Sequence, residues 1–260
     1  MNAVSWNYRG LGNPRAVHAL RDVVKSHNPE ILFLIETLSN KERMKQLSGK
    51  LGFSSHLAVE CVGRSGGIAL LWKSSVKCNV LNCSSNFIDA KLSNANGVEW
   101  RLTGYYGFPE CGRRKESWDL LKWLANYSDL PWVVIGDFND MINIADKKGN
   151  NSHPQVLLDG FKQTIDDCGL IELDLVGGNY TWEKSKGKPE WARERLDRAF
   201  ASASWWSLFP LCNLRVHHCI HSDHDLIHFE MYSTNHTKKK FRFRFENAWL
   251  KENNFYVEVS

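Results

Sequence analysis

Several segments that resemble strands carry polar side chains at points where burial would not favour them. These residues are Asn7 after VSW, Glu36 after ILFLI, Asp137 and Asn139 after WVVIG, Asp197 within RLDRAF, and Asp223 with His224 in HSDHDLI. A buried carboxylate costs several kcal/mol unless a partner or a metal ion compensates its charge. If the strands are neighbours, their ends bring all of these side chains to one rim of the fold.

The chemistry of this set follows from its oxygen and nitrogen atoms. It is rich in carboxylate and amide oxygens, and it contains one histidine and no cysteine. We therefore predict a hard cation, Mg²⁺ or alternatively Mn²⁺, in preference to Zn²⁺. A histidine beside carboxylates supplies either a general base or a cationic hydrogen-bond donor. With a carboxylate that orients water, these groups are the parts needed to hydrolyse a phosphodiester.

Each residue also has a structural interpretation. Singly, Asn7 and Glu36 are more typical of structural roles than of catalysis, and Asp197 fits a surface ion pair. Asp137 fits an Asx turn, but an apolar strand that enters an acid-x-amide pair favours function there. The joint occurrence of the whole set is harder to explain structurally than any one member. We interpret Asp140 as a turn residue only.

The elements that position these residues alternate along the chain. Amphipathic periodicity predicts helices at 13–27, 40–52, 113–128 and 153–169, the first with Asn13 as N-cap and Pro14 at the first helical position. Apolar runs between turn residues predict strands at 3–7, 30–37, 66–72, 77–83, 86–92, 98–106, 132–136, 179–183, 195–200, 213–219 and 225–231. This interleaving predicts two packed sheets with helices outside.

Composition sets broad limits on the class of protein. The 260 residues are 43% hydrophobic and 24% charged, which is typical of a soluble globular protein with a sizeable core. The formal charge of +4 favours an anionic partner. Seven cysteines without a CxxC pair or a zinc-type spacing argue against disulfides and structural zinc. Without a signal-peptide pattern or an apolar run of membrane-spanning length, we expect an intracellular protein with no membrane partner.

The pattern changes near the C-terminus. Residues 233–244, STNHTKKKFRFR, have the composition of a linker or basic arm, and an amphipathic helix begins after them. We therefore expect one domain at 1–231, followed at 232–260 by a basic linker and the start of a truncated segment. The chain is expected to be the front part of a longer protein.

The motifs WNYRGL, IET, GDFND, RLDRAF and SDH, in this order, resemble those of the endonuclease/exonuclease/phosphatase superfamily over roughly residues 1–230. This superfamily includes exonuclease III-like abasic-site nucleases, type I deoxyribonucleases and the endonuclease domain of LINE-type non-LTR retrotransposons. The resemblance implies an α/β fold, a four-layer sandwich of two packed mixed β-sheets flanked by helices as in exonuclease III and DNase I. It also implies Mg²⁺-dependent phosphodiester hydrolysis at one rim.

The resemblance implies roles for the metal and water ligands. Glu36 matches the principal metal ligand, and Asp223 matches an aspartate assigned to metal binding or water positioning. Asp137 matches the aspartate that orients or deprotonates the attacking water. Asn7 matches an asparagine that supports the catalytic aspartate or the phosphate.

It implies roles for the remaining residues as well. Asn139 matches a donor to the phosphate, and Asp197 matches the aspartate that pairs with the final histidine, His224. Tyr106 is the preferred match to the tyrosine that contacts the scissile phosphate, with Tyr105 as the alternative.

The chain departs from the abasic-site nucleases at three points. Arg9 stands where WNxDG has an acid, and the WNxRGLG form followed by NPR resembles plant LINE-type proteins. Glu194 replaces the aromatic residue that precedes RLD in the repair enzymes. SDHxP reads SDHDL, and loss of the proline at Leu226 could loosen the loop that holds His224.

The favoured function is a DNA-nicking endonuclease of a LINE-like retroelement, which leaves a 3′-hydroxyl on its duplex substrate. We expect a monomeric, nuclear protein that is fused to reverse transcriptase in an intact element, because the tail is similar to the joining segment of plant elements. Basic residues that could contact DNA phosphates are Arg113, Arg114, Lys115, Lys184, Lys186 and Lys188, although each taken singly is more typical of a solvated surface charge. The alternatives are an abasic-site nuclease or phosphatase of the same superfamily and, from another class, an inactive nucleic-acid-binding remnant.

Overall fold

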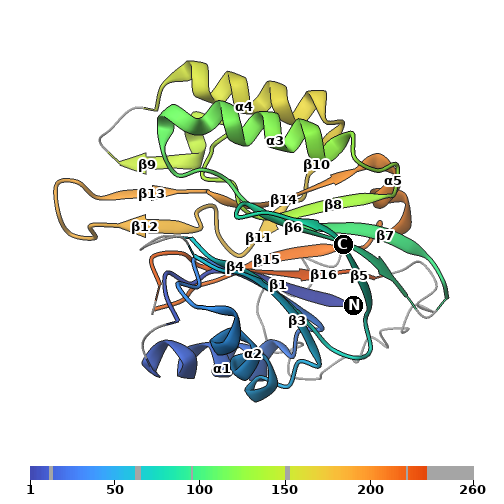
Figure 1. Cartoon of the computed structure of the whole chain (residues 1–260). Helices are drawn as coiled ribbons and strands as arrows, with labels where there is room; N and C mark the ends of the chain where they lie inside the picture. The colour runs from blue at the N-terminus through green and yellow to red at the C-terminus, as the bar shows by residue number, and fades with distance from the viewer. Residues whose placement is uncertain (12–13, 62–65, 95, 150–152, 221, 233–260) are drawn as a thin grey trace, which may run out of the picture.

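A computed structural model describes residues 1–11, 14–61, 66–94, 96–149, 153–220 and 222–232 (Figure 1). The predicted N-cap Asn13, the basic segment at 233–244 and the helix expected after it lie outside the described residues. The division into a domain at 1–231 and a following segment therefore stays a prediction.

The described residues form two large β-sheets that pack face to face (Figure 1). The first sheet has the strand order β11 (Leu175–Val176), β15 (Asn213–His217), β16 (Leu226–Glu230), β1 (Asn2–Asn7), β2 (Ile31–Ile35), β4 (Ile68–Trp72) and β3 (Ser55–Val59). The second has the order β10 (Leu170–Glu172), β14 (Asp197–Ser202), β8 (Trp132–Asp137), β7 (Glu99–Tyr106), β6 (Phe87–Ser93) and β5 (Lys77–Cys83). A small third sheet contains β12 (Trp182–Lys184), β13 (Ala192–Glu194) and β9 (Lys147–Gly149).

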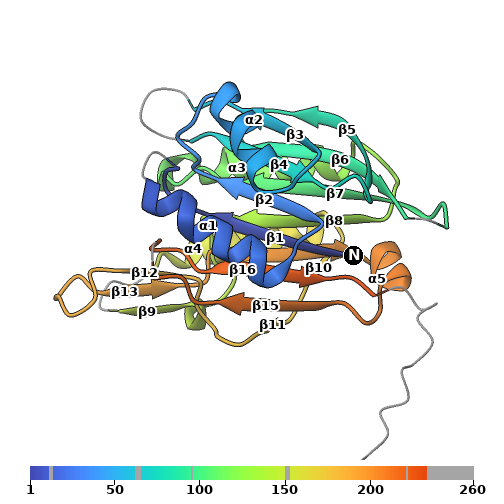
Figure 2. The same ribbon diagram turned by 90° about the horizontal axis from the view of Figure 1, so that it is seen from below.

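Helices cover the outer face of each large sheet, which completes four layers (Figures 1 and 2). The helices of the described residues are α1 (Pro14–His27), α2 (Lys41–Lys50), α3 (Arg114–Ala125), α4 (Gln155–Asp167) and α5 (Ala203–Leu208), with 3-10 turns at Cys111–Arg113 and Ile144–Asp146. The first two pack on the first sheet and α3 and α4 on the second. The predicted fold class, a four-layer α/β sandwich, is confirmed.

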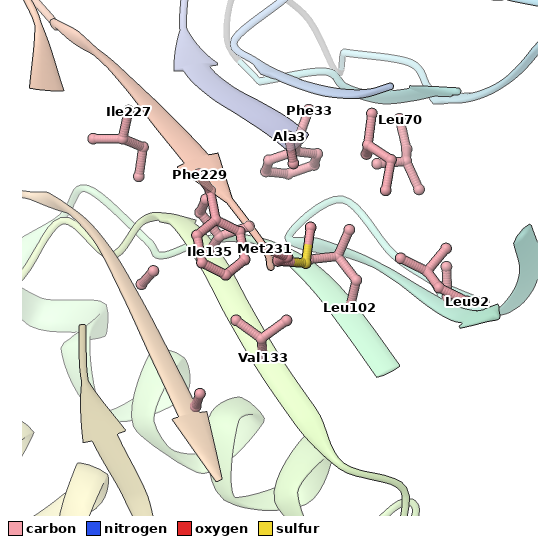
Figure 3. Close-up of a cluster of buried hydrophobic side chains, with 14 of the residues drawn as sticks. Ala3, Phe33, Leu70, Leu92, Leu102, Val133, Ile135, Ile227, Phe229 and Met231 are labelled. Carbon is pink, nitrogen blue, oxygen red and sulfur yellow. The ribbon is translucent and has the colours of Figure 1, made fainter. Parts of the chain in front are cut away.

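The alternation of side chains along the central strands explains the continuous apolar runs in the sequence. Phe33 of β2 and Val133 of β8 lie in the central core between the sheets (Figure 3). Leu32 and Leu34 face the helices on one side, and Val134 faces the helices on the other. Strands buried on both faces need apolar residues at every position, so the runs lack a polar face.

Two details of the fold differ from the sequence prediction. The strand β3 was not predicted, because SHLAV is half-buried at a sheet edge and shows no clear apolar alternation. The strand expected at 179–183 is instead β12, at Trp182–Lys184, and it belongs to the small third sheet. Short strands such as β9 and β13 depend on pairing with each other more than on their own composition.

Candidate active site

Strand register brings the predicted polar residues to one rim. The parallel pair β1–β2 aligns Asn7 with Ile35, so Glu36 follows directly beside Asn7. The parallel pair β7–β8 aligns Tyr106 with Asp137, and the antiparallel strand β14 places Asp197 opposite Asp137. Because parallel strands end at the same edge of a sheet, their last residues meet there.

Gly136 allows β8 to approach its neighbour closely before Asp137. Its φ is +151°, and a Cβ at this position would lie 2.0 Å from the carbonyl oxygen of Tyr105. No side chain fits in that space, so the glycine of GDFND is required by the contact between β7 and β8.

Asp137 lies at the centre of the rim and is fully buried. Asn7 Nδ2 donates to Asp137 Oδ2 at 2.9 Å and to Glu36 Oε1 at 3.0 Å, and Asn139 N donates to Asp137 Oδ1 at 2.9 Å. Burial raises the pKa of Asp137 to about 6, although His224 and these hydrogen bonds act in the opposite direction. The carboxylate is thus fixed in place and is a stronger base than an exposed aspartate.

His224 lies between two carboxylates. Its Nδ1 is 2.9 Å from Asp197 Oδ2, and its Nε2 is 3.9 Å from Asp137 Oδ2. Burial alone would lower the pKa of His224, but the charges of Asp197 and Asp137 raise it to about 9. The imidazole is therefore a cation at neutral pH, which favours a hydrogen-bond donor over a general base.

Hydrogen bonds restrain the backbone around His224, although Leu226 stands in place of the proline of SDHxP. Trp6 Nε1 donates to the carbonyl oxygen of His224 at 3.1 Å, and His224 N donates to Ser222 Oγ at 3.1 Å. Asp225 N donates to the carbonyl oxygen of Thr181 at 2.7 Å. Hydrogen bonds thus provide here the restraint that a proline gives to the SDHxP loop.

The two candidate tyrosines face opposite sides of β7. Tyr106 Oη donates to Glu36 Oε1 at 3.0 Å, whereas Tyr105 Oη donates to the carbonyl oxygen of Ser117, beneath α3, at 2.7 Å. Successive side chains of a strand point to opposite faces, so only one of the two can reach the rim. Burial raises the pKa of Tyr106, which keeps its hydroxyl protonated and able to donate.

Two further residues at the rim were not predicted as members of the site. Arg9 pairs with Asp223, and its Nε lies 3.7 Å from Glu36 Oε2. Trp182 Nε1 donates to Asp223 Oδ2 at 3.0 Å, and its ring lies beside His224 with 6.3 Å between ring centres. The replacement of an acid by Arg9 in the first motif was the only sequence signal for either residue.

The GDFND segment also contributes structural contacts. Asn139 Nδ2 donates to the carbonyl oxygen of Gly107 at 3.0 Å. Asp140 follows the strand in a turn, as predicted, but it is buried and accepts from Trp118 Nε1 at 2.8 Å. Its carboxylate therefore joins this turn to α3.

The donor set at the rim fits a divalent cation. The Oδ1 atoms of Asn7, Asp197 and Asp223 have no hydrogen-bond partner within the described part of the chain, although each atom is buried. Ligand atoms of Asp137, Asp197 and His224 also lie within 4.8 Å of one another, but a cationic His224 has no lone pair for an ion, so the oxygen atoms are the candidate ligands. Buried oxygens without partners need compensation, and a hard cation provides it.

Grooves adjoin the rim on two sides. One of about 220 Å³ is lined by Asn86, Tyr106 and Arg113, and another of about 330 Å³ is lined by Trp182, Lys186 and Asp223. Tyr106 lines the first groove and Asp223 the second, so an extended ligand has room beside both rim residues.

The predicted basic contacts divide into exposed and buried residues. Lys184, Lys186 and Lys188 are exposed on β12 and the turn that follows it. The prediction for Arg114 is wrong, because its side chain is buried and Nη1 donates to the carbonyl oxygen of Phe108 at 2.5 Å.

The two packed sheets and the acid-rich rim define a class of nucleases and phosphatases. The chain belongs to the endonuclease/exonuclease/phosphatase family, whose model matches residues 4–224.

Among the described residues no helix has both the length and the apolar character needed to cross a membrane. All seven cysteines lie in the described residues and are free, in agreement with the sequence prediction.

Solved structures of low sequence identity share the fold. The endonuclease domain of TRAS1, a telomere-specific non-LTR retrotransposon, is 14% identical, with coverage of 90% of this chain and 99% of that chain and a TM-score of 0.65. The 3′-5′ exonuclease NExo from Neisseria meningitidis is 18% identical, with coverage of 89% and 99% and a TM-score of 0.66. An AP endonuclease from Archaeoglobus fulgidus is 16% identical, with the same coverage and a TM-score of 0.66. A comparison with curated protein sequences finds no match.

Proposed function

We propose that this protein is a divalent-metal-dependent endonuclease of a LINE-like retroelement that nicks one strand of duplex DNA and leaves a 3′-hydroxyl. The observation that carries this proposal is the position of Asp137, fully buried between Asn7 and the cationic His224. A buried carboxylate held in this way is suited to orient a water molecule in line with a scissile phosphodiester.

Glu36 and Asp223 are the proposed ligands of Mg²⁺, for which Mn²⁺ is the expected substitute. Asp223 Oδ1 is buried without a partner among the described residues, and Glu36 keeps part of its side chain exposed. When bound, the ion stabilises negative charge on the phosphoryl oxygens. Arg9 pairs with both carboxylates, and since its side chain is 60% exposed it is free to swing toward a phosphate when they take up a cation.

The remaining roles belong to side chains of the rim. Asp137 accepts the proton of the attacking water, and its raised pKa makes it an effective base near neutral pH. His224 donates a hydrogen bond to a phosphoryl oxygen. Asp197 maintains the charge and the orientation of the His224 ring. Tyr106 and Asn139 are the proposed donors to the phosphate from the opposite side.

A polynucleotide substrate is favoured by the surroundings of the rim. One groove adjoins the rim at Tyr106 and another at Asp223. Three exposed lysines, Lys184, Lys186 and Lys188, lie on β12 and the turn after it. Glu194 stands where the abasic-site nucleases have an aromatic residue, and it accepts from Lys147 Nζ at 2.5 Å. A charged, paired side chain does not line an apolar pocket for an abasic sugar, which disfavours the repair function.

The proposal extends to the setting of the domain. We infer that residues 1–231 act as a monomeric nuclease in the nucleus and that 232–260 connect it to reverse transcriptase in an intact element of plant type. A chain of residues 1–231 should then elute as a monomer and nick DNA at the rate of the full chain. Loss of activity on removing 232–260 would contradict this boundary.

The nuclease activity is tested on supercoiled plasmid with Mg²⁺ or Mn²⁺, with EDTA as the metal-free control. Nicking should occur only with the ion, and DNA polymerase should extend the nick directly if it carries a 3′-hydroxyl. Asp137→Asn should abolish nicking, and Asp159→Asn, which alters an exposed carboxylate of α4, should not. Absence of nicking with either ion, in a chain that still binds DNA, would support the inactive remnant. Preferential cleavage of an abasic oligonucleotide would support the repair enzyme.

A further inference from the structure

Three histidines from distant parts of the sequence meet on the outer face of the first sheet. His27 is the last residue of α1, His217 the last of β15, and His228 lies within β16. The ring centre of His27 is 4.3 Å from that of His217 and 4.9 Å from that of His228. Figure 2 shows α1 crossing β1 and β16, which brings these elements together.

The cluster has ligand atoms without partners. The Nε2 atoms of His217 and His228 are buried and have no hydrogen-bond partner in the described part of the chain. His228 is only 7% exposed, so water does not replace the missing partner readily. Buried polar nitrogens are nearly always paired, and two unpaired ones in a single cluster require a reason.

Burial lowers the pKa of each histidine, to about 4 for His228, and the charge of Glu230 only partly opposes this effect. The nearby Arg215 lowers the pKa of His217 and His228 further. An imidazole binds a transition metal through the lone pair of a ring nitrogen, and the Nε2 atoms of His217 and His228 lack a partner among the described residues.

We propose that His27, His217 and His228 form a site for a transition-metal ion, with Zn²⁺ as its expected occupant. One ligand nitrogen from each ring lies within 4.8 Å of the other two. Zinc–nitrogen bonds of about 2.0–2.1 Å in tetrahedral geometry place ligand nitrogens about 3.3 Å apart, so modest side-chain rotations complete the site. Because His27 and His217 are only partly buried, an ion can enter and a water molecule can fill the fourth position.

This site is separate from the rim in both chemistry and location. Its ligands are three imidazoles, which prefer a borderline ion such as Zn²⁺, whereas the rim offers mainly oxygen ligands for a hard ion. Bound metal would connect the end of α1 to β15 and β16 and would therefore stabilise the folded state. Zinc-type spacing in the sequence could not reveal it, since His27 and His217 lie 190 positions apart.

The site is tested on the full chain after removal of metal with EDTA. Zn²⁺ binding is measured by calorimetry and by the shift in melting temperature, with saturating Mg²⁺ present to occupy the rim. His27→Gln and His217→Gln each remove one partly exposed ligand, and His18→Gln changes an exposed histidine on the same helix. Circular dichroism verifies that each variant folds.

We expect one equivalent of Zn²⁺ to bind the wild-type chain and His18→Gln and to raise the melting temperature of both. His27→Gln and His217→Gln should bind that equivalent at least tenfold more weakly and lose the thermal shift. Equal Zn²⁺ stoichiometry and affinity in the wild type and His217→Gln would overturn the proposal, as would absence of Zn²⁺ binding to the wild type. In either case the histidines are a packed cluster without a metal-binding role.

Discussion

Replacing Asp137 by Asn should stabilise the metal-free protein while it removes nuclease activity. Burial raises the pKa of Asp137 from 3.8 to about 6, so the ionised side chain at pH 7 costs about 3 kcal/mol relative to a neutral one. An asparagine is isosteric and neutral, but its single oxygen accepts from only one of Asn7 Nδ2 and Asn139 N. A lost hydrogen bond costs about 1 kcal/mol, which leaves a net gain of about 2 kcal/mol.

The pH dependence of this gain identifies its source. A carboxyl group whose pKa is higher in the folded state contributes stability below its unfolded pKa, and that contribution is lost as the pH rises through the folded value. The wild-type chain therefore loses stability between about pH 4 and pH 6. The difference in free energy of unfolding between Asp137→Asn and the wild type should grow over the same pH interval and stay constant at higher pH.

Denaturation in urea with EDTA, at pH 4 and pH 7, measures the free energy of unfolding of both chains. At pH 7 the variant should also melt about 4–8 °C higher, since about 1 kcal/mol corresponds to about 2–4 °C at this size. Mg²⁺ should stabilise the wild type and so reduce the difference in stability between it and Asp137→Asn. The reasoning would be refuted if Asp137→Asn were no more stable than the wild type at pH 7. It would also be refuted if the stability gain of the variant at pH 4 were as large as at pH 7. Asp159→Asn, on an exposed helical surface, should change neither value.

Three further substitutions address other parts of the structure. Asp197→Asn removes one of the charges that raise the pKa of His224, so the alkaline limit of nicking should move to lower pH; an unchanged pH profile between 6 and 10 would contradict this. Arg9→Ala removes the cation that pairs with the two proposed metal ligands, so Mn²⁺ should bind several-fold more tightly by electron paramagnetic resonance; equal or weaker binding would contradict it. Asp89→Ala leaves Arg101 buried without its ion pair and should lower the free energy of unfolding by about 3–5 kcal/mol in urea; a loss below 1 kcal/mol would contradict it.

Asn7, Glu36 and Asp137 could be grouped from the sequence because each lies at or directly after the end of an apolar strand, whereas Arg9 and Trp182 were missed. Parallel pairing then brings these ends together without further information, as for Asn7 and Glu36. The sequence alone could not decide between Tyr105 and Tyr106, since the choice depends on which face of β7 meets the other sheet. Burial of Arg114 was equally hidden, because an arginine in the first turn of a helix is usually exposed.

Contacts between distant loops were beyond sequence reasoning for a different reason. Trp182 reaches Asp223 through a bridge between β12 and the SDH loop, and neither segment shows a pattern that specifies the other. The histidine cluster likewise arises from the packing of α1 on the first sheet. Such contacts depend on how elements are placed in space, which local periodicity does not encode.

Three of the six described non-glycine residues with positive φ lie at the rim. Arg9, Glu36 and Asn139 all have positive φ, at +52°, +53° and +53°. Each such conformation costs roughly 1–2 kcal/mol in a residue other than glycine, and it persists only where surrounding contacts fix it. Here Asn7 fixes Glu36, and the carbonyl oxygen of Gly107 fixes Asn139. These three residues carry polar groups to the rim, as expected for a preorganised site, whereas Asn28, Leu38 and Ser185, which also have positive φ, are not among its members.

The charges of the rim favour a divalent cation as its partner. Its charged members are the carboxylates of Glu36, Asp137, Asp197 and Asp223 and the cations of Arg9 and His224. Four negative and two positive charges leave a net charge of −2, which one divalent cation neutralises. A phosphodiester is itself an anion, and this rim would repel it in the absence of a metal ion. Substrate binding should therefore depend on the ion as strongly as the chemical step does, so EDTA should weaken DNA binding to the inactive Asp137→Asn chain less than to the wild type.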